Sequence, residues 1–337
     1  MRPFNYQKAG SLGEASRLGA GSEQGQIDAP LQFLAGGTTV IDLMKLDVLR
    51  PATLVDLGGL RAQHGAIESG PAGLHLGAFA RMAEAAGHPY IVRNYPVIAE
   101  SLNQAASAQL RNMATLGGNV LQRTRCAYYR DPSWSACNKR TPGSGCAAIG
   151  GSNRNHAVLG TTPACISQYP GDFAVALVAL EASIELSGPA GARHIAIEAL
   201  HRRIADQPHI ETTLQPGEII TGFLVPPGAW TRRSLYLKIR DRTSYEFAIA
   251  SAAVALDLDG EVVRQARIGI GGAAYSPWRA HEAEQALTGK PLTEATAEHA
   301  AHVAFQGAVT HGGNDNKPEL GRRTLVRALL QARGMEV

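Results

Sequence analysis

The sequence has few cysteines, no charge excess and no long apolar run, and each shortage excludes a class of protein. Four cysteines in 337 residues are too few for a disulfide-stapled scaffold. A net charge of only +3 does not favour a protein that binds nucleic acid or a membrane surface. The longest apolar runs, residues 173–180 and 247–256, are shorter than the roughly 20 residues of a membrane-spanning helix. We therefore expect no membrane insertion.

The N-terminus also lacks the features of a targeting segment. Residues 1–6 contain no basic region followed by an apolar core, so we expect no secretory signal in this chain. In contrast, glycine is abundant: 37 of the 337 residues, a share of about 11% against a usual 7%. This excess predicts backbone positions that need a positive φ or a close approach to a ligand.

Glycine and proline divide the chain into short helices and strands in mixed order. Ser11 and Glu14 have the spacing of a capping box, which predicts a helix that ends near Gly19. Other helical patterns cover residues 40–46, 80–86, 96–108 and the chain beyond about Arg279. Expected strands cover residues 31–35, 53–57, 218–225, 234–240, 249–258 and 261–270. Because helices and strands do not alternate strictly, the sequence predicts an α+β fold.

Two glycine turns have the composition of an anion-binding site. The first, residues 34–39, can expose consecutive N–H groups where a helix begins and where the helix dipole favours an anion. The second, residues 114–119, adds donors from Thr115 and Asn119. Each is by itself also consistent with an ordinary turn, which is the default interpretation of the first. Two such turns in one domain can hold both ends of a dinucleotide-like cofactor, and the absence of a G-x-G-x-x-G motif disfavours a Rossmann site.

The four cysteines all lie within 40 residues, in a stretch rich in Gly, Pro, Asn, Ser and Thr that we expect to be a long loop, residues 123–170. Their spacing is C-x10-C-x8-C-x18-C, without the close pairs usual in zinc sites. A cubane iron–sulfur cluster needs four converging thiolates and N–H groups directed at the sulfurs, and it tolerates irregular spacing. The spacing leaves a cluster, zinc, disulfides and inert thiols open for Cys126, Cys137, Cys146 and Cys165.

Several other polar residues have two interpretations. Alternation in residues 235–240 puts Lys238 on one face of a strand with Tyr236 and Arg240. This face is by default solvated, although Lys238 could instead lie near a cofactor as a fixed positive charge. Asp172 and Glu218 are by default turn or cap residues. No Ser/His/Asp order or paired-carboxylate spacing supports hydrolytic chemistry.

Five segments together resemble a known family. The runs FLAGGTTVIDLMK and RNMATLGGNVLQRTRC are similar to the FAD-binding medium subunit of bacterial molybdenum hydroxylases, the xanthine dehydrogenase family. The nearest resemblance is to the FAD/[4Fe-4S] subunit of periplasmic aldehyde oxidoreductases. It covers nearly the whole chain in the right order, and its most specific part is the cysteine-bearing loop. The matching segments are residues 33–45, 76–84, 111–126, 137–160 and 236–256.

The resemblance implies a two-part FAD-binding domain of the vanillyl-alcohol-oxidase (PCMH) type and a smaller α+β C-terminal domain. The implied limits are 1–58, 59–226 with the [4Fe-4S] loop at 123–170, and 229–337. Cys126, Cys137, Cys146 and Cys165 would ligate the cluster. Thr39 stands where many relatives have Asn, and both can donate a hydrogen bond. The implied FAD-binding residues are Gln32, Phe33, Leu34, Ala35, Gly36, Gly37, Thr38, Thr39, Val40, Thr115, Gly118, Asn119, Asp172, Glu218 and Lys238.

The resemblance also implies a role as an oxidoreductase subunit that has no catalytic side chain of its own. A large partner subunit with the molybdenum cofactor would oxidise the substrate, and a small partner with two [2Fe-2S] clusters would pass electrons to FAD here. FAD would deliver them to an external acceptor, with Lys238 tuning the flavin. Co-export with a signal-bearing partner would place the complex in the periplasm; otherwise it is cytoplasmic. A stand-alone FAD oxidoreductase and a zinc-stapled interaction protein remain alternatives.

Overall fold

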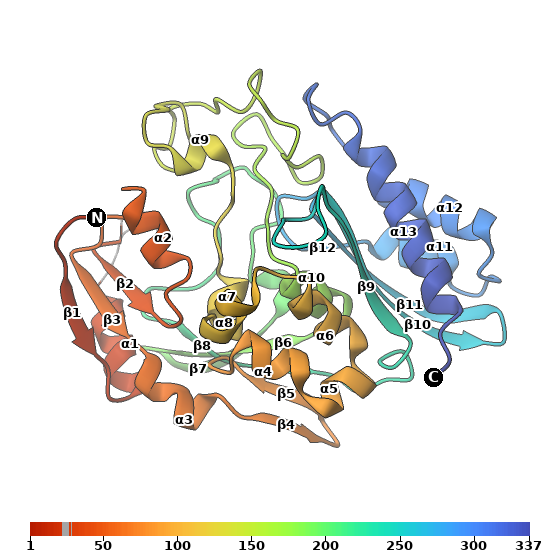
Figure 1. Cartoon of the computed structure of the whole chain (residues 1–337), viewed down its shortest axis with the longest axis horizontal. Coiled ribbons are helices and arrows are strands. Elements are labelled where there is room, and N and C mark those ends of the chain that lie inside the picture. Colours follow the sequence, from red (N-terminus) through yellow and green to blue (C-terminus); the bar gives the residue numbers. More distant parts are fainter. Residues whose placement is uncertain (22–26, 28) are drawn as a thin grey trace.

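The computed structural model describes residues 1–21, 27 and 29–337, which form three β-sheets set along the long axis of the molecule (Figure 1). The first sheet is parallel, with strand order β1-β3-β2: β1 (Asn5–Lys8), β3 (Thr53–Asp56) and β2 (Leu31–Leu34). Helices α1 (Leu12–Ala20) and α2 (Val40–Lys45) lie in the connections between its strands. The Ser11 side chain accepts a hydrogen bond from the Glu14 N–H, which confirms the predicted helix start.

The second sheet is antiparallel, and its strand order is β4-β5-β8-β6-β7. Its strands are β4 (Ile67–Gly70), β5 (Gly73–Gly77), β6 (Ser183–Gly188), β7 (Gly191–Ala196) and β8 (Ile219–Val225). The β6–β7 hairpin escaped prediction, although Ile184 and Leu186 alternate with polar residues ahead of a Gly-Pro-Ala-Gly turn. Because β8 pairs with both β5 and β6, this sheet joins segments that are far apart in the sequence.

Short helices accompany the second sheet. They are the 3₁₀ turns η1 (Gly58–Leu60) and η2 (Ile197–Ala199), and helices α3 (Arg61–His64), α4 (Met82–Gly87), α5 (Pro89–Asn94), α6 (Pro96–Asn103), α7 (Ala108–Met113), α8 (Leu116–Val120) and α10 (Phe173–Ala179). Every residue of α10 is buried, and the helix packs against α6 and the third sheet. This helix therefore belongs to the central core of the molecule.

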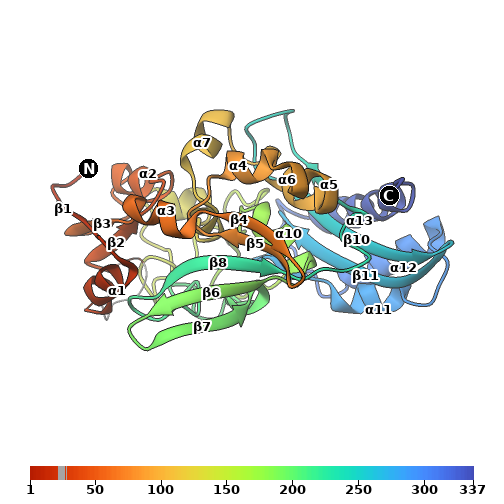
Figure 2. The ribbon, with the colours of Figure 1, turned by 90° about the horizontal axis from the view of Figure 1, so that it is seen from below.

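The third sheet is antiparallel and lies at the opposite end of the molecule from the first (Figure 2). Its strands, in order, are β12 (Trp278–Arg279), β11 (Val262–Gly271), β10 (Ala250–Asp259) and β9 (Ser234–Ile239). It packs against α11 (His281–Leu287), α12 (Glu294–Ala304) and α13 (Lys317–Arg333) around a second apolar core. Within the described residues, no helix combines the length and apolar composition needed to cross a membrane.

The sequence favours a solvated face for Tyr236 and Lys238 on β9, but this face is buried. Tyr236 and Lys238 are 3% and 8% exposed because α6 and Asp172, the residue before α10, lie against them. The Tyr236 hydroxyl donates to the Asp172 carboxylate at 2.6 Å, and the Lys238 ammonium contacts the same carboxylate at 2.8 Å. Polar alternation is therefore misleading here, because a buried carboxylate satisfies the polar side chains of the strand.

Residues 123–170 form the expected long loop, which contains one short helix, α9 (Ala127–Arg130), and is called the cysteine loop below. It crosses the molecule between α2 and the C-terminal helices (Figure 1). Arg130 pairs with Asp42 of α2 at 2.7 Å. At the other end of the loop, the Val158 N–H donates to the Ala273 carbonyl oxygen at 2.8 Å. The cysteine loop is thus anchored both to the first sheet region and to the C-terminal region.

Truncation of Phe173 tests the central core. Its ring is fully buried and meets the Phe223 ring edge-on, with 5.8 Å between centroids. We expect Phe173→Ala to lower the free energy of unfolding by about 3–5 kcal/mol, because it leaves a cavity. Phe247→Ala is the matched control: that side chain is exposed, and its loss should cost about 1 kcal/mol or less. Denaturant unfolding measures both, and equal losses would contradict the assignment of Phe173 to the core.

Candidate functional site

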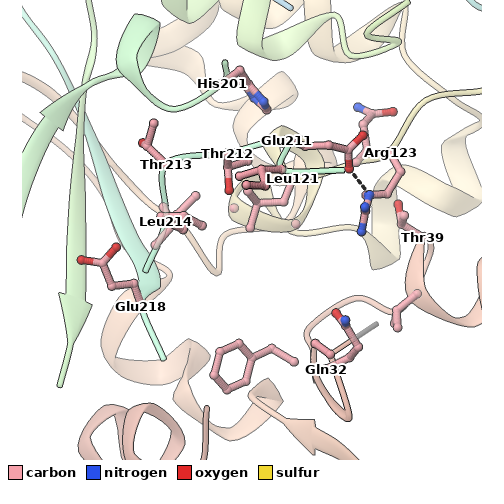
Figure 3. Close-up of a pocket in the computed structure, with 18 of the residues that line it drawn as sticks. Gln32, Thr39, Leu121, Arg123, His201, Glu211, Thr212, Thr213, Leu214 and Glu218 are labelled. Carbon is pink, nitrogen blue, oxygen red and sulfur yellow. Dashed lines mark ion pairs between the residues drawn. The ribbon is translucent and has the colours of Figure 1, made fainter. Parts of the chain in front are cut away.

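A cavity of about 1110 Å³ lies between the first two sheets and the cysteine loop, and it is called the large cavity below (Figure 3). Most of its lining residues fall within four stretches, residues 31–40, 114–124, 167–169 and 201–220. Both predicted glycine turns are therefore part of one site. The third and fourth stretches were not predicted to line it, except for Glu218.

The two glycine turns touch each other at the wall of the large cavity. A Cβ atom on Gly36 would collide with the Met113 carbonyl oxygen and lie 2.8 Å from the Ala114 Cα. Gly37 has a φ of +75°, which side chains rarely allow. The Gly36, Gly37 and Thr38 N–H groups donate no hydrogen bond within the described residues. The first turn thus offers unused donors beside the second turn, which suits a bound diphosphate.

A buried ion cluster of Arg123, Lys139 and Glu211 forms another part of the lining, and it is called the charged wall below. The Lys139 ammonium contacts one Glu211 oxygen at 2.7 Å, and Arg123 pairs with the other. Burial alone would raise the pKa of Glu211, but the two cations hold it below its usual value. Two cations share one carboxylate, so the charged wall carries a net positive charge that favours an anionic ligand.

His201 lines the large cavity close to the charged wall (Figure 3). Its ring packs against the Tyr169 ring at 4.7 Å between centroids. Burial lowers the pKa of His201 to about 4, so the imidazole is neutral at physiological pH. Its Nε2 atom has no hydrogen-bond partner in the described part of the chain. No local sequence motif marks His201, so its position in the lining of the large cavity becomes visible only from the fold.

Most of the predicted FAD-binding residues line the large cavity. They are Gln32, Phe33, Ala35, Gly36, Gly37, Thr38, Thr39, Val40, Thr115, Gly118 and Glu218. Glu218 is bound by Arg193 through two hydrogen bonds of 2.5 and 2.7 Å. The lining does not include Leu34, Asn119, Asp172 or Lys238.

The buried ion pair of Asp172 and Lys238 joins β9 to the helices beside it. Besides Asp172, the Lys238 ammonium group contacts the Gln104 carbonyl oxygen at 3.1 Å. Burial raises the pKa of Asp172 in spite of the opposing effect of Lys238. The pair therefore braces β9 against α10 and α6, and tuning of a flavin by Lys238 stays a prediction.

All four cysteines line a second, much smaller space of about 10 Å³, called the cysteine cavity below. None forms a disulfide. Backbone N–H groups are directed at the sulfurs: Ser167 donates to Cys165 at 3.4 Å, and Cys126 and Cys146 also accept backbone hydrogen bonds. A hydrogen bond from Cys165 lowers the pKa of Cys146 to about 6. This donor set has the chemistry of an iron–sulfur site.

The cysteine side chains are not grouped around a common metal position in the described residues. Among the described residues, no group of three or more His, Cys, Asp or Glu side chains is arranged to hold a metal ion. His156 lies against the cavity, with its Nε2 atom 3.2 Å from the Cys126 sulfur. Burial raises the pKa of Cys126 to about 11, so this thiol is protonated in the arrangement seen.

Alanine at position 36 tests the contact between the glycine turns. We expect Gly36→Ala to lower the free energy of unfolding by about 1–3 kcal/mol, because the new methyl group meets rigid backbone atoms. Gly87→Ala is the control, since a Cβ there meets nothing within 4 Å and should leave stability nearly unchanged. Chemical denaturation compares the two variants, and an unaffected Gly36→Ala protein would refute the contact.

The pH dependence of stability tests the burial of His201. Its pKa is lowered in the folded chain, so the unfolded chain takes up the proton first as the pH falls from about 6.5 towards 4. Stability is lost over that window. His201→Gln should therefore lose about 2 kcal/mol less than the parent protein between pH 7 and pH 4.5. His299→Gln, at an exposed position, should follow the parent curve, and identical curves for all three proteins would contradict the burial.

Comparison with known proteins places the chain in a family. Residues 2–228 match the model of the FAD-binding domain in molybdopterin dehydrogenase, and residues 235–334 match the C-terminal domain of CO dehydrogenase flavoprotein. The aldehyde oxidoreductase FAD-binding subunit PaoB of Escherichia coli K12 is 40% identical over 335 residues, covering 99% of both chains. The carbon monoxide dehydrogenase medium chain of Afipia carboxidovorans is 26% identical, covering 99% of this chain and 96% of that one.

Solved structures have the same fold. A reconstituted CO dehydrogenase from Oligotropha carboxidovorans superposes with a TM-score of 0.76 at 23% identity, covering 99% of both chains. Quinoline 2-oxidoreductase from Pseudomonas putida 86 gives a TM-score of 0.74 at 22% identity, covering 98% of this chain and 97% of that one. The α+β fold class is thereby confirmed. The chain belongs to the family of FAD-binding medium subunits of molybdenum hydroxylases, which its sequence resembles.

Proposed function

We propose that this chain is the FAD- and [4Fe-4S]-carrying electron-transfer subunit of a heterotrimeric molybdenum hydroxylase that oxidises aldehydes. The observation that carries the proposal is the match, over 99% of both chains, to an aldehyde oxidoreductase FAD-binding subunit. The partners would be a large molybdenum-cofactor subunit and a small subunit with two [2Fe-2S] clusters. Electrons would enter from the small subunit and leave to an external acceptor. Substrate oxidation itself would take place in the large subunit.

The large cavity supports the FAD part of the proposal. Its volume of about 1110 Å³ lies just above the usual range for small-molecule sites, as a cofactor of this size needs. FAD, when bound, supplies the storage and release of electron pairs. The unused N–H groups of Gly36, Gly37 and Thr38 would donate to its diphosphate. Arg123 and Lys139 would balance the diphosphate charge from the charged wall.

The cysteine cavity supports the cluster part of the proposal. Four thiols with backbone N–H groups directed at three of them match the ligand set of a [4Fe-4S] cluster. The four thiols come from a loop with one short helix, α9, in which backbone hydrogen bonds such as that from Ala147 to Ala136 fix the chain. His156 would then stand beside Cys126 as a hydrogen-bonding neighbour of the cluster.

Export and domain limits complete the proposal. We propose that the chain reaches the periplasm by co-export with a signal-bearing partner subunit, with the cytoplasm as the alternative. The proposed limits remain 1–58, 59–226 and 229–337. In support, each of the three sheets lies within one of these segments.

Cofactor analysis of the purified full-length chain tests the proposal. We expect a flavin absorbance spectrum, one FAD, and about four iron and four sulfide per chain. Cys146→Ser should lose the iron and sulfide because it removes a ligand, whereas Ser133→Ala in the same loop should keep them. Optical spectroscopy with iron, sulfide and zinc assays gives the answer. Zinc without flavin would overturn the proposed function, and flavin without iron would remove the cluster from it.

A further inference from the structure

Two side chains line both cavities at once. Lys139 and Ser167 are part of the lining of the large cavity and also of the cysteine cavity. Each stands two residues after a cysteine, Lys139 after Cys137 and Ser167 after Cys165. The wall between the two cavities is therefore made by the same loop segments that carry the thiols. A movement of these thiols must move this wall.

The Lys139 ammonium group is held rigidly in that wall. Its side chain is only 3% exposed, and it contacts a Glu211 oxygen at 2.7 Å, the Pro208 carbonyl oxygen at 3.2 Å and the Tyr275 hydroxyl at 3.3 Å. These contacts use all three N–H bonds of an ammonium group. Its position is thus set by residues 208–211 and by Tyr275, which lie directly beside it in the fold.

Packing also links the Lys139 side chain to the cysteine cavity. The Cys165 side chain packs in one small buried cluster with Tyr275, whose hydroxyl accepts a hydrogen bond from the Lys139 ammonium group. Since a buried cation is costly without its partner, a change around Cys165 alters how strongly Lys139 is held by Glu211. Arg123 shares the Glu211 carboxylate, so the whole charged wall responds.

We propose that Lys139 is a positioning residue that couples the two sites, so that the state of the cysteine site sets the affinity of the large cavity for FAD. The coupling rests on the proposed function, because it needs FAD to occupy the large cavity. It runs through the position of one ammonium group. By linkage, bound FAD would in turn stabilise the arrangement of the cysteines.

A double-mutant cycle on the full-length chain tests the coupling. The dissociation constant of FAD is measured by fluorescence quenching for the parent chain, Cys165→Ala, Lys139→Met and the double variant. We expect Cys165→Ala to weaken FAD binding about fivefold in the parent and by less than about 1.5-fold in the Lys139→Met background. A role of Lys139 in folding alone would not make the two effects depend on each other.

Controls separate coupling from general damage. Arg154→Met removes a cation from the same loop, where Arg154 pairs with Asp241 and lines neither cavity, so Cys165→Ala should keep its full effect there. Lys139→Arg keeps the charge and should keep most of the coupling. If Lys139→Met does not fold, Lys139→Gln replaces it with the same expectation.

The possible failures are distinguishable. If Cys165→Ala weakens FAD binding equally with and without Lys139, or has no effect in the parent, the coupling is overturned and the proposed function stands. If the parent chain binds no FAD at all, the proposed function itself fails. Iron measured on the parent chain, Lys139→Met and Arg154→Met reports the reciprocal effect: faster iron loss to a chelator in Lys139→Met than in Arg154→Met supports the coupling, and equal rates contradict it.

Discussion

The arrangement of both cavities depends on the ion pairs that the Glu211 carboxylate forms with Arg123 and Lys139. It pairs with two buried cations from different parts of the cysteine loop, Arg123 at its start and Lys139 between two cysteines. Removing one partner of a buried ion pair typically costs about 3–5 kcal/mol, and here one carboxylate serves two cations. Glu211 itself belongs to the segment that closes the large cavity. One anion therefore holds residues 201–220 against the loop that carries the thiols.

The positions of the glycine turns are fixed by steric contact rather than by charge. Gly36 is needed because the backbone of Met113 and Ala114 occupies the space of a side chain, and Gly37 because of its positive φ. Together with the charged wall, they surround the large cavity with backbone donors on one side and fixed cations on another. Neither feature uses a mobile side chain, so the site is prepared for an anionic cofactor before one binds.

Local patterns in the sequence predicted the parts of the site that are local in the chain. The glycine turns, the helix cap at Ser11 and the long loop could be predicted because neighbouring residues determine them. The pairing of Arg123 with Glu211 could not, since it joins segments that meet only in the fold, and neither could the burial of Tyr236 and Lys238 against α6 and the start of α10. The cysteine spacing alone left four chemistries open, and the shared cavity shows that the four thiols converge.

Convergence of the four thiols has a practical consequence for chemical labelling. The chain contains only these four cysteines, so a thiol-reactive reagent reads the state of the cysteine loop without background from any other region. The same loop is anchored to Asp42 in the N-terminal part and to Ala273 in the C-terminal part. The labelling rate of four sulfurs thus becomes a single reporter for the assembly of the entire molecule.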